Sequence, residues 1–224
     1  MIVAIDGPAA SGKSTAAIGV AKTLNITHLD TGSMYRAVTY GLISNQINFK
    51  DTKSITDFLE SLKLRFSNSK KRTVLILNNN NVTDLIRTSV ISENVSEVSA
   101  IKIVRDFMVK IQRQMASDTD CILEGRDIGT VVFPNADFKF FMTADEKSRA
   151  ERRLIELVSS GDRNASELNS VLDDLKVRDH KDSTRNHSPL MKAKDALVID
   201  TTYLTINEVI DKIVNTVNQK RTLY

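Results

Sequence analysis

The stretch IDGPAASGKST, residues 5–15, governs how the rest of the sequence is interpreted. Within it, GPAASGKS fits the pattern G-x-x-x-x-G-K-S, with Gly7, Gly12, Lys13 and Ser14 at the fixed positions. The apolar run IVAI precedes the pattern and a helical pattern follows it, which is the strand, loop and helix order that a phosphate-binding loop needs. A turn that merely starts a helix would require neither the lysine nor the serine. The stretch therefore predicts a nucleoside triphosphate site.

Each residue type in this loop has a physical reason to be there. Glycines allow backbone N–H groups to curl around a β-phosphate, and the following helix points its positive end at the anion. Lys13 is expected to reach the β- and γ-phosphates, Ser14 to ligate Mg²⁺, and Thr15 to lie on the α-phosphate side. The whole set predicted to bind ATP is Gly7, Pro8, Ala9, Ala10, Ser11, Gly12, Lys13, Ser14 and Thr15.

Short apolar runs alternate with helical patterns along much of the chain. The runs, bounded by Gly, Asp, Pro or Thr, are 2–6, 26–30, 121–125, 138–143 and 196–200, and the helical patterns are 13–24, 145–160 and 205–219. Apolar runs without polar alternation suit parallel strands that are covered on both faces. The alternation predicts an α/β fold with a central parallel sheet of about five strands flanked by helices.

The segment from about residue 51 to 97 breaks this alternation. It holds one helical piece at 54–62, followed by β-rich runs at 62–67 and 73–83 that are joined by Ser, Lys and Asn. Antiparallel hairpins are the simplest explanation of this composition. We expect a small α+β insertion in the main sheet, with Asn78 to Asn81 forming a turn.

Composition narrows the class of protein. A hydrophobic fraction of 41% and a charged fraction of 26% are ordinary for a globular domain, which excludes a fibre or a disordered chain. A net charge of +3, without a Lys/Arg stripe or any tryptophan platform, argues against nucleic acid as a partner. Cys121 is the single cysteine, so no intrachain disulfide forms, and its strand-like neighbours favour a small buried thiol. No apolar run approaches the roughly 18 residues of a membrane span or resembles a signal peptide, so a soluble cytoplasmic protein is expected.

Phosphate-binding loops occur in GTPases, motor ATPases and small-molecule kinases. The chain has no N-K-x-D sequence for guanine, and the strand at 121–125 leads into EGRD rather than ending in an acidic pair. A kinase is favoured on these grounds. A kinase for another small acceptor, a nucleotide switch protein and a nucleic-acid-binding protein remain the alternatives at this point.

Arginines at loop or helix edges are the second chemical signal. Phosphoryl transfer between two anions depends mainly on positive charge around the moving group. In EGRDIGTVVFP, residues 124–134, an Arg-Asp pair follows a strand, at the edge where open α/β sheets bind ligands. RDHKDSTR, residues 178–185, is either a solvated helix face or a lid that closes over phosphates and excludes water.

Four stretches in this order, GPAASGKST, LDTGSMYRAVT (29–39), ILEGRDIGTVVFP (122–134) and RDHKDSTRNHSPL (178–190), resemble the bacterial cytidylate kinases. These nucleoside monophosphate kinases phosphorylate CMP and dCMP from ATP. The resemblance implies a P-loop kinase fold and a single domain, working as a monomer without nucleic acid or membrane. It further implies a core (1–40, 98–160, 186–224), a nucleoside-monophosphate-binding insertion (about 41–97) and a helical lid (about 161–185).

The resemblance also implies the acceptor site. Tyr35, Arg36 and Arg126 correspond to residues near the acceptor phosphate, Ser96, Arg105 and Asp127 to residues that read cytosine, and Arg178 and Asp182 to sugar contacts. Arg185 joins the phosphate region, and Thr31 belongs to the same acceptor set. The residues expected to affect turnover most are Lys13, Arg126, Arg178 and Arg185. The three histidines, His28, His180 and His187, match no catalytic pattern.

Overall fold

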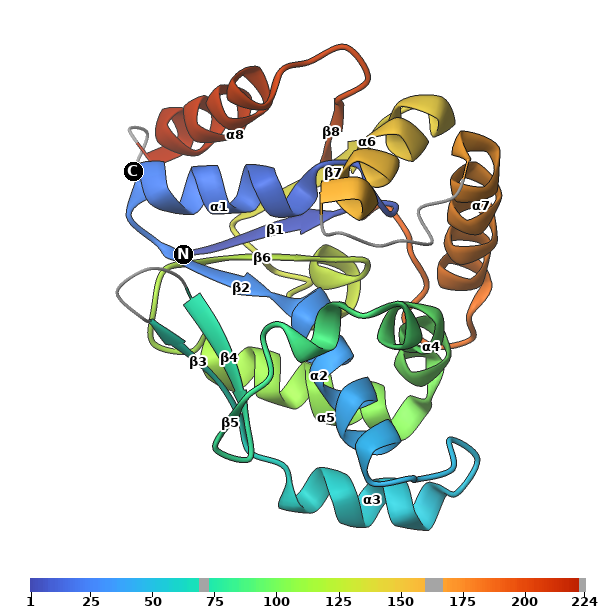
Figure 1. Ribbon diagram of the computed structural model, residues 1–224. Helices are drawn as coiled ribbons and strands as arrows, with labels where there is room; N and C mark the ends of the chain where they lie inside the picture. The colour runs from blue at the N-terminus through green and yellow to red at the C-terminus, as the bar shows by residue number, and fades with distance from the viewer. Residues whose placement is uncertain (69–72, 160–166, 222–224) are drawn as a thin grey trace. The chain divides into compact units, whose positions relative to one another are not determined.

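The computed structural model describes residues 1–68, 73–159 and 167–221 (Figure 1). Its backbone contacts divide the chain into two compact units. The first comprises Met1–Leu29 and Ala116–Tyr224, and the second comprises Asp30–Met115.

The first unit is built on a five-stranded sheet of order β2-β6-β1-β7-β8. The strands are β1 (Ile2–Asp6), β2 (Thr27–Asp30), β6 (Cys121–Gly125), β7 (Phe138–Thr143) and β8 (Leu197–Asp200). β1 lies in the middle and pairs in parallel with β6 and β7, and β7 pairs in parallel with β8. The expected parallel sheet is confirmed, with strand ends displaced by at most one residue from the sequence-based ranges.

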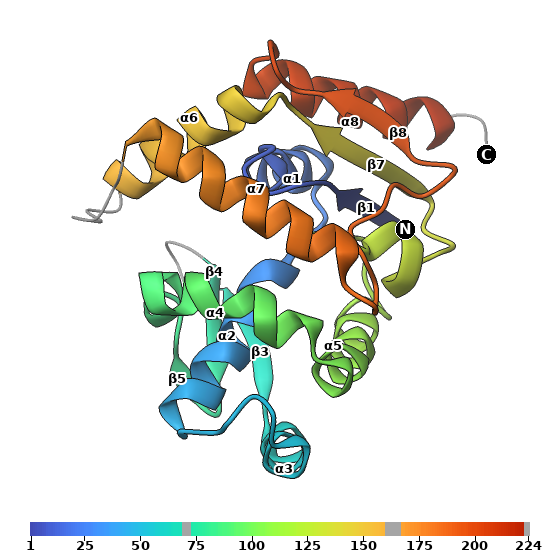
Figure 2. The ribbon, with the colours of Figure 1, turned by 90° about the vertical axis from the view of Figure 1, so that its right-hand side faces the viewer.

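Helices α1 (Lys13–Leu24) and α8 (Ile206–Arg221) pack against each other and bury an apolar core with the sheet. Helices α6 (Glu146–Ser159) and α7 (Leu168–Thr184) lie side by side, as Figure 2 shows, and share a small core with Ala9 of the phosphate-binding loop. The helical lid expected at 161–185 is therefore a helix from Leu168 onward, while residues 161–166 lie outside the described ranges. One further turn, the π-helix η2 (Ile128–Val132), follows β6.

Cys121 opens β6 and is fully buried. Burial raises the pKa of its thiol to about 11. The prediction of a small buried thiol is confirmed.

The second unit combines helices with a small antiparallel sheet of order β3-β4-β5. Its elements are α2 (Thr31–Ser44), α3 (Thr52–Ser61), β3 (Leu64–Asn68), β4 (Thr73–Leu77), β5 (Asn80–Asn81), the short 3-10 helix η1 (Leu85–Arg87), α4 (Ser89–Ala100) and α5 (Lys102–Met115). Asn78 and Asn79 have φ angles of 46° and 69° and form the turn between β4 and β5. The predicted antiparallel pairing is present, but the turn is shorter than expected, because Asn80 and Asn81 pair with β4 as strand β5.

This compact unit covers more of the chain than the insertion expected at 41–97, because α2 and α5 contribute side chains to its core. Met34 and Val38 of α2 and Met108 of α5 are fully buried in the same cluster as Ile55 of α3. Sequence patterns did not predict α2, α4 or α5 as helices. α2 begins where the Asp30 side chain accepts a hydrogen bond from the Ser33 N–H, so capping and packing sustain a helix that is rich in Gly, Thr and Tyr.

Among the helices that the structure describes, we find none with the length and apolarity needed to cross a lipid bilayer.

Candidate active site

The phosphate-binding loop starts where β1 ends and leads directly into α1. A Cβ at Gly7 would lie 2.0 Å from the backbone oxygen of Met142, so only glycine fits beside β7. Ala10 and Gly12 have φ angles of 57° and 87°, which turn the chain back on itself before α1 begins. The sequence motif is thus a loop at the carboxyl edge of the sheet, followed by a helix N-terminus, as an anion site requires.

Lys13 is buried inside this loop. Its Nζ donates to the Pro8 carbonyl at 2.5 Å and to Ser11 Oγ at 3.2 Å. Burial, together with the nearby Arg126 and Arg178, lowers the pKa of Lys13 to about 7, against the opposing effect of Glu124. The two guanidinium groups contribute positive potential at this place, and an anionic ligand would favour the protonated form of Lys13 beside them.

Ser14 is the first-turn hydroxyl expected to ligate Mg²⁺. Its Oγ donates to Oε2 of Glu124 at 2.5 Å, and Glu124 is almost completely buried at the end of β6. Among the described residues, no group of three or more His, Cys, Asp and Glu side chains could hold a metal ion by itself. Mg²⁺ is usually bound through one or two protein oxygens together with substrate phosphates and water, so this donor set fits it.

Asp6, the last residue of β1, connects the phosphate-binding loop to the loop after β6. Its two carboxylate oxygens accept hydrogen bonds from the backbone N–H groups of Ile128 at 2.8 Å and Gly129 at 2.7 Å. Burial raises the pKa of this carboxyl to about 6. The side chain fixes the turn that directly follows Arg126 and Asp127.

Arg126, Arg178 and Arg185, which we call the arginine cluster, surround the buried carboxylate of Asp182. Arg126 Nε donates to Asp182 Oδ2 at 2.9 Å, and Arg185 Nη1 lies 3.9 Å from Asp182 Oδ1. Burial opposes ionisation of Asp182, but the three guanidinium groups outweigh it and lower the pKa of its carboxyl. Arg185 Nη2 also lies 3.8 Å from Asp127 Oδ1. The structure therefore brings five of the predicted residues together in the first unit.

One buried and one partly buried side chain connect the α6 and α7 pair to the phosphate-binding loop. Asp179 of α7 accepts from the Ala9 N–H at 3.0 Å, and Arg149 of α6 donates to the Ala9 carbonyl at 3.2 Å. Arg149 and Asp179 also form an ion pair with each other. Helix α7 is thus joined to the backbone of the loop by charge-assisted hydrogen bonds.

A cavity of about 170 Å³ lies beside the loop and the start of α1. Its lining includes Gly12, Thr15, Arg152, Thr201 and Val209. Arg152 is held across it by Thr201, whose carbonyl accepts from Nη2 at 2.6 Å. The cavity combines apolar walls with a guanidinium plane next to the phosphate loop, which suits a flat heteroaromatic ring.

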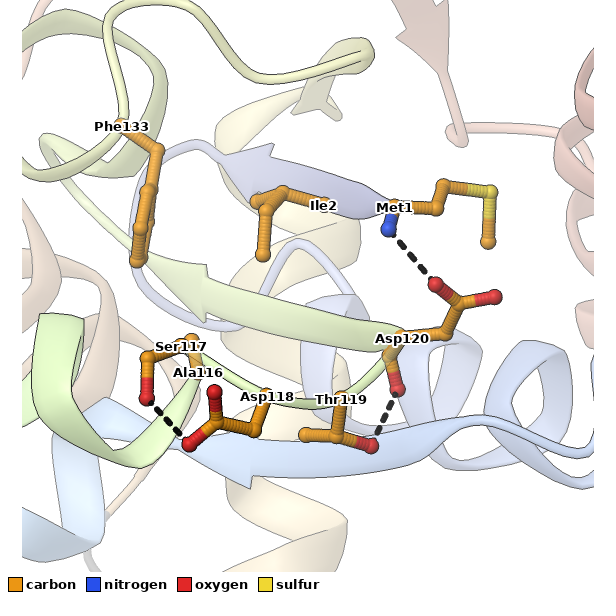
Figure 3. A pocket seen from close by; sticks show the side chains of 8 residues that line it. All are labelled: Met1, Ile2, Ala116, Ser117, Asp118, Thr119, Asp120 and Phe133. Carbon is orange, nitrogen blue, oxygen red and sulfur yellow. Dashed lines mark hydrogen bonds and ion pairs between the residues drawn. The ribbon is translucent and has the colours of Figure 1, made fainter.

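A larger depression of about 430 Å³ lies at the opposite edge of the sheet, where β1 and β6 begin (Figure 3). It is lined by Met1, Ile2, Phe133 and residues 116–120, and the Met1 amine pairs with Asp120 at 2.6 Å. None of the predicted site residues lines it. Ligands of open α/β sheets bind at the carboxyl ends of the strands, so we do not assign this depression to the reaction.

The second unit holds the remaining predicted residues. The Arg105 guanidinium is buried, lies 5.2 Å from the centre of the Tyr35 ring and donates to the Ser99 carbonyl. Arg36 is held by Ser92 Oγ at 2.9 Å and by the Ile86 carbonyl. The last two predicted residues, Thr31 and Ser96, lie at the start of α2 and on α4.

Several residues that lie beside the predicted ones, in one unit or the other, were not predicted from the sequence. They are Asp6, Ser92, Glu124, Arg149, Arg152, Asp179 and Thr201. Two of them carried a usable signal: Asp6 directly precedes Gly7, and Glu124 is the next-to-last residue of the strand that leads into the Arg-Asp pair. The others depend on contacts between elements that are distant in the sequence.

Comparison with known proteins gives the family. The cytidylate kinase family model matches residues 3–219. A cytidylate kinase of Fusobacterium nucleatum is 48% identical over 211 residues, covering 94% of each chain. Another, of Halalkalibacterium halodurans, is 43% identical over 220 residues, covering 98% of each chain. The solved shikimate kinase from Bacteroides thetaiotaomicron, 9% identical with a TM-score of 0.51 over 97% of this chain and 98% of its own, shows the fold alone. With a motif-bearing phosphate loop and a family match over nearly its full length, this chain belongs to the cytidylate kinase family.

Proposed function

We propose that this protein transfers the γ-phosphoryl group of ATP to CMP or dCMP, giving ADP and CDP or dCDP, in pyrimidine nucleotide metabolism. The observation that carries the proposal is the convergence of the buried Lys13 with the arginine cluster in one unit. Such a concentration of fixed positive charge stabilises a transferring phosphoryl group and is of little use to a protein that only binds a nucleoside.

The donor is proposed to lie on the phosphate-binding loop. The backbone N–H groups of the loop and the Lys13 side chain would face the oxygens of the triphosphate. The residues proposed to hold it are Gly7, Pro8, Ala9, Ala10, Ser11, Gly12, Lys13, Ser14 and Thr15. The adenine ring is proposed to enter the 170 Å³ cavity beside Arg152. Mg²⁺, when bound through Ser14 and the phosphates, would neutralise negative charge on the β- and γ-oxygens.

The acceptor is proposed to bind through residues of the matched motifs, which are Thr31, Tyr35, Arg36, Ser96, Arg105, Arg126, Asp127, Arg178, Asp182 and Arg185. Asp127 is the proposed reader of the base, because a carboxylate accepts from the 4-amino group of cytosine and disfavours the carbonyl that uracil has there. No general base is required, since an acceptor phosphate oxygen is already ionised at neutral pH. Lys13, Arg126, Arg178 and Arg185 would lower the barrier by position and charge.

Measuring ADP formation in a coupled assay with CMP, dCMP, UMP, AMP and GMP as acceptors tests the proposal. Turnover should be fast with CMP and dCMP, slower with UMP, and near background with the purines. Background rates with every acceptor would refute it. Asp127→Ala should erode the preference for CMP over UMP more than it weakens ATP binding, and an equal loss with both acceptors would contradict the role of Asp127.

The resemblance also supports a monomer that works in the cytoplasm, without membrane or nucleic-acid partners. Light scattering during size-exclusion chromatography should return the 25.0 kDa mass of one chain. A mass of twice that value would contradict the monomer.

A further inference from the structure

His28 is the one histidine whose ring contacts the proposed donor site through another side chain in the described part of the chain. It lies on β2, next to β6, and its Nε2 is 3.0 Å from Oε1 of Glu124. The side chains of His28 and Glu124 are 20% and 5% exposed, so water competes little for this contact. No catalytic pattern in the sequence includes His28.

Glu124 divides its two oxygens between two neighbours. Oε1 faces His28, and Oε2 accepts from Ser14 Oγ at 2.5 Å. An ionised carboxylate has no hydrogen to donate, so His28 must present an N–H and Ser14 its O–H. The Ser14 hydrogen is thereby directed toward Glu124, which leaves the oxygen lone pairs available to a cation.

A carboxylate held at only one oxygen could rotate about its terminal torsion, because such torsions are broad. The bond from His28 fixes the second oxygen and with it the direction in which Oε2 meets Ser14. Partners of this kind, one step beyond a metal-binding group, commonly change metal affinity by about 10- to 100-fold.

We propose that His28 is a positioning residue for Mg²⁺·ATP, acting through Glu124 on the Ser14 hydroxyl. The proposal rests on the proposed function in one respect, namely that Ser14 is a ligand of the Mg²⁺ that accompanies ATP. His28 itself contacts neither nucleotide nor metal.

The test compares ATP binding by isothermal titration calorimetry in excess Mg²⁺ and in EDTA, for the wild type, His28→Ala and His28→Gln. Alanine should reduce the Mg²⁺-dependent gain in ATP affinity by about 10-fold, the lower end of the range for such partners, and leave binding in EDTA unchanged. Glutamine, which carries an N–H at a similar distance from the backbone, should restore most of the gain. Thr27→Ala is the matched control on the same strand, because Thr27 is exposed and its hydroxyl only approaches Thr119.

In turnover assays with CMP, His28→Ala should raise the half-saturating concentrations of Mg²⁺ and ATP and leave the KM for CMP unchanged. An unchanged Mg²⁺-dependent gain in the alanine variant would overturn the proposal. So would an equal loss of affinity in Mg²⁺ and EDTA, which would indicate general loosening of the site. The binding experiment needs no acceptor, so it remains decisive even if no nucleoside monophosphate supports turnover and the proposed function fails.

Discussion

Replacing Asp182 by asparagine tests how strongly the buried carboxylate at the centre of the arginine cluster stabilises the fold. Asp182 is 5% exposed, bonds Arg126 at 2.9 Å and lies 3.9 Å from Arg185. Asparagine has nearly the same shape and keeps one oxygen for Arg126, so the change removes charge and little packing. The three guanidinium groups would then lose the counter-charge that they share, and the Asp127 carboxylate would remain 3.8 Å from Arg185.

The expected loss follows from the cost of leaving a buried charge without its partner. Removing one member of a buried ion pair typically costs about 3–5 kcal/mol. Because the asparagine oxygen can still accept from Arg126, we expect the lower end, about 3 kcal/mol of unfolding free energy. For a chain of 150–250 residues this corresponds to a Tm lower by about 6–12 °C.

Urea denaturation followed by circular dichroism at neutral pH and low salt measures this difference. The guanidinium groups lower the pKa of Asp182 in the folded state, so its stabilising effect is present above the unfolded value of 3.8 and is lost as the pH falls through the folded pKa. The gap between wild type and variant should therefore shrink in acid. Asp174→Asn, an exposed position on the same helix, should change stability by less than about 0.5 kcal/mol. A loss below about 1 kcal/mol for Asp182→Asn would refute the reasoning, since it would place the pair in the range of solvent-screened surface ion pairs.

Three further changes test individual parts of the first unit. Gly7→Ala would place a Cβ 2.0 Å from the backbone oxygen of Met142, so it should lower the free energy of unfolding more than Gly12→Ala does. At Gly12 the nearest atom to an added Cβ lies 3.8 Å away, and the strain at a φ of 87° is about 1–2 kcal/mol. Similar melting temperatures for both variants would contradict the clash at Gly7. Burial raises the pKa of Asp6 from 3.8 to about 6, so the contribution of its protonated form to the free energy of unfolding is full below pH 3.8 and is lost as the pH rises through 6. The free energy of unfolding of the wild type, relative to that of Asp6→Asn, should therefore fall by about 3 kcal/mol between these two pH values. A flat difference in urea titrations at several pH values would contradict this expectation. The pKa of Cys121 is raised from 9.0 to about 11, so its reaction with a thiol reagent should be at least about 100-fold slower in the native than in the urea-unfolded protein, and comparable rates would contradict its burial.

The sequence alone determined the parts of this protein that are encoded locally. The phosphate-binding loop could be predicted because a fixed spacing of Gly, Lys and Ser specifies this loop locally. Gly7 in fact lies at a place where no Cβ fits. The five strands could be predicted because buried parallel strands are continuous apolar runs. Motif order along the whole chain was also sufficient to give the family, which the comparisons confirm.

Local patterns failed where stability comes from packing. α2 and α4 have modest apolar stripes, and neither begins with an unmistakable sequence signal, yet both bury residues in the core of the second unit. Helix propensity is a weak guide in such segments, because most helical stability in proteins comes from tertiary contacts.

Only the tertiary structure decided which charged groups meet. Arg126 and Asp182, and likewise Ser14, Glu124 and His28, are far apart in the sequence and become neighbours only once the strands are ordered in the sheet. A single charged residue in a sequence is most often solvated, and its burial beside a partner is what gives it a defined pKa, a fixed direction and a role. The order β2-β6-β1 brings His28 and Ser14 to the two oxygens of one carboxylate, a relation that no spacing along the chain could express.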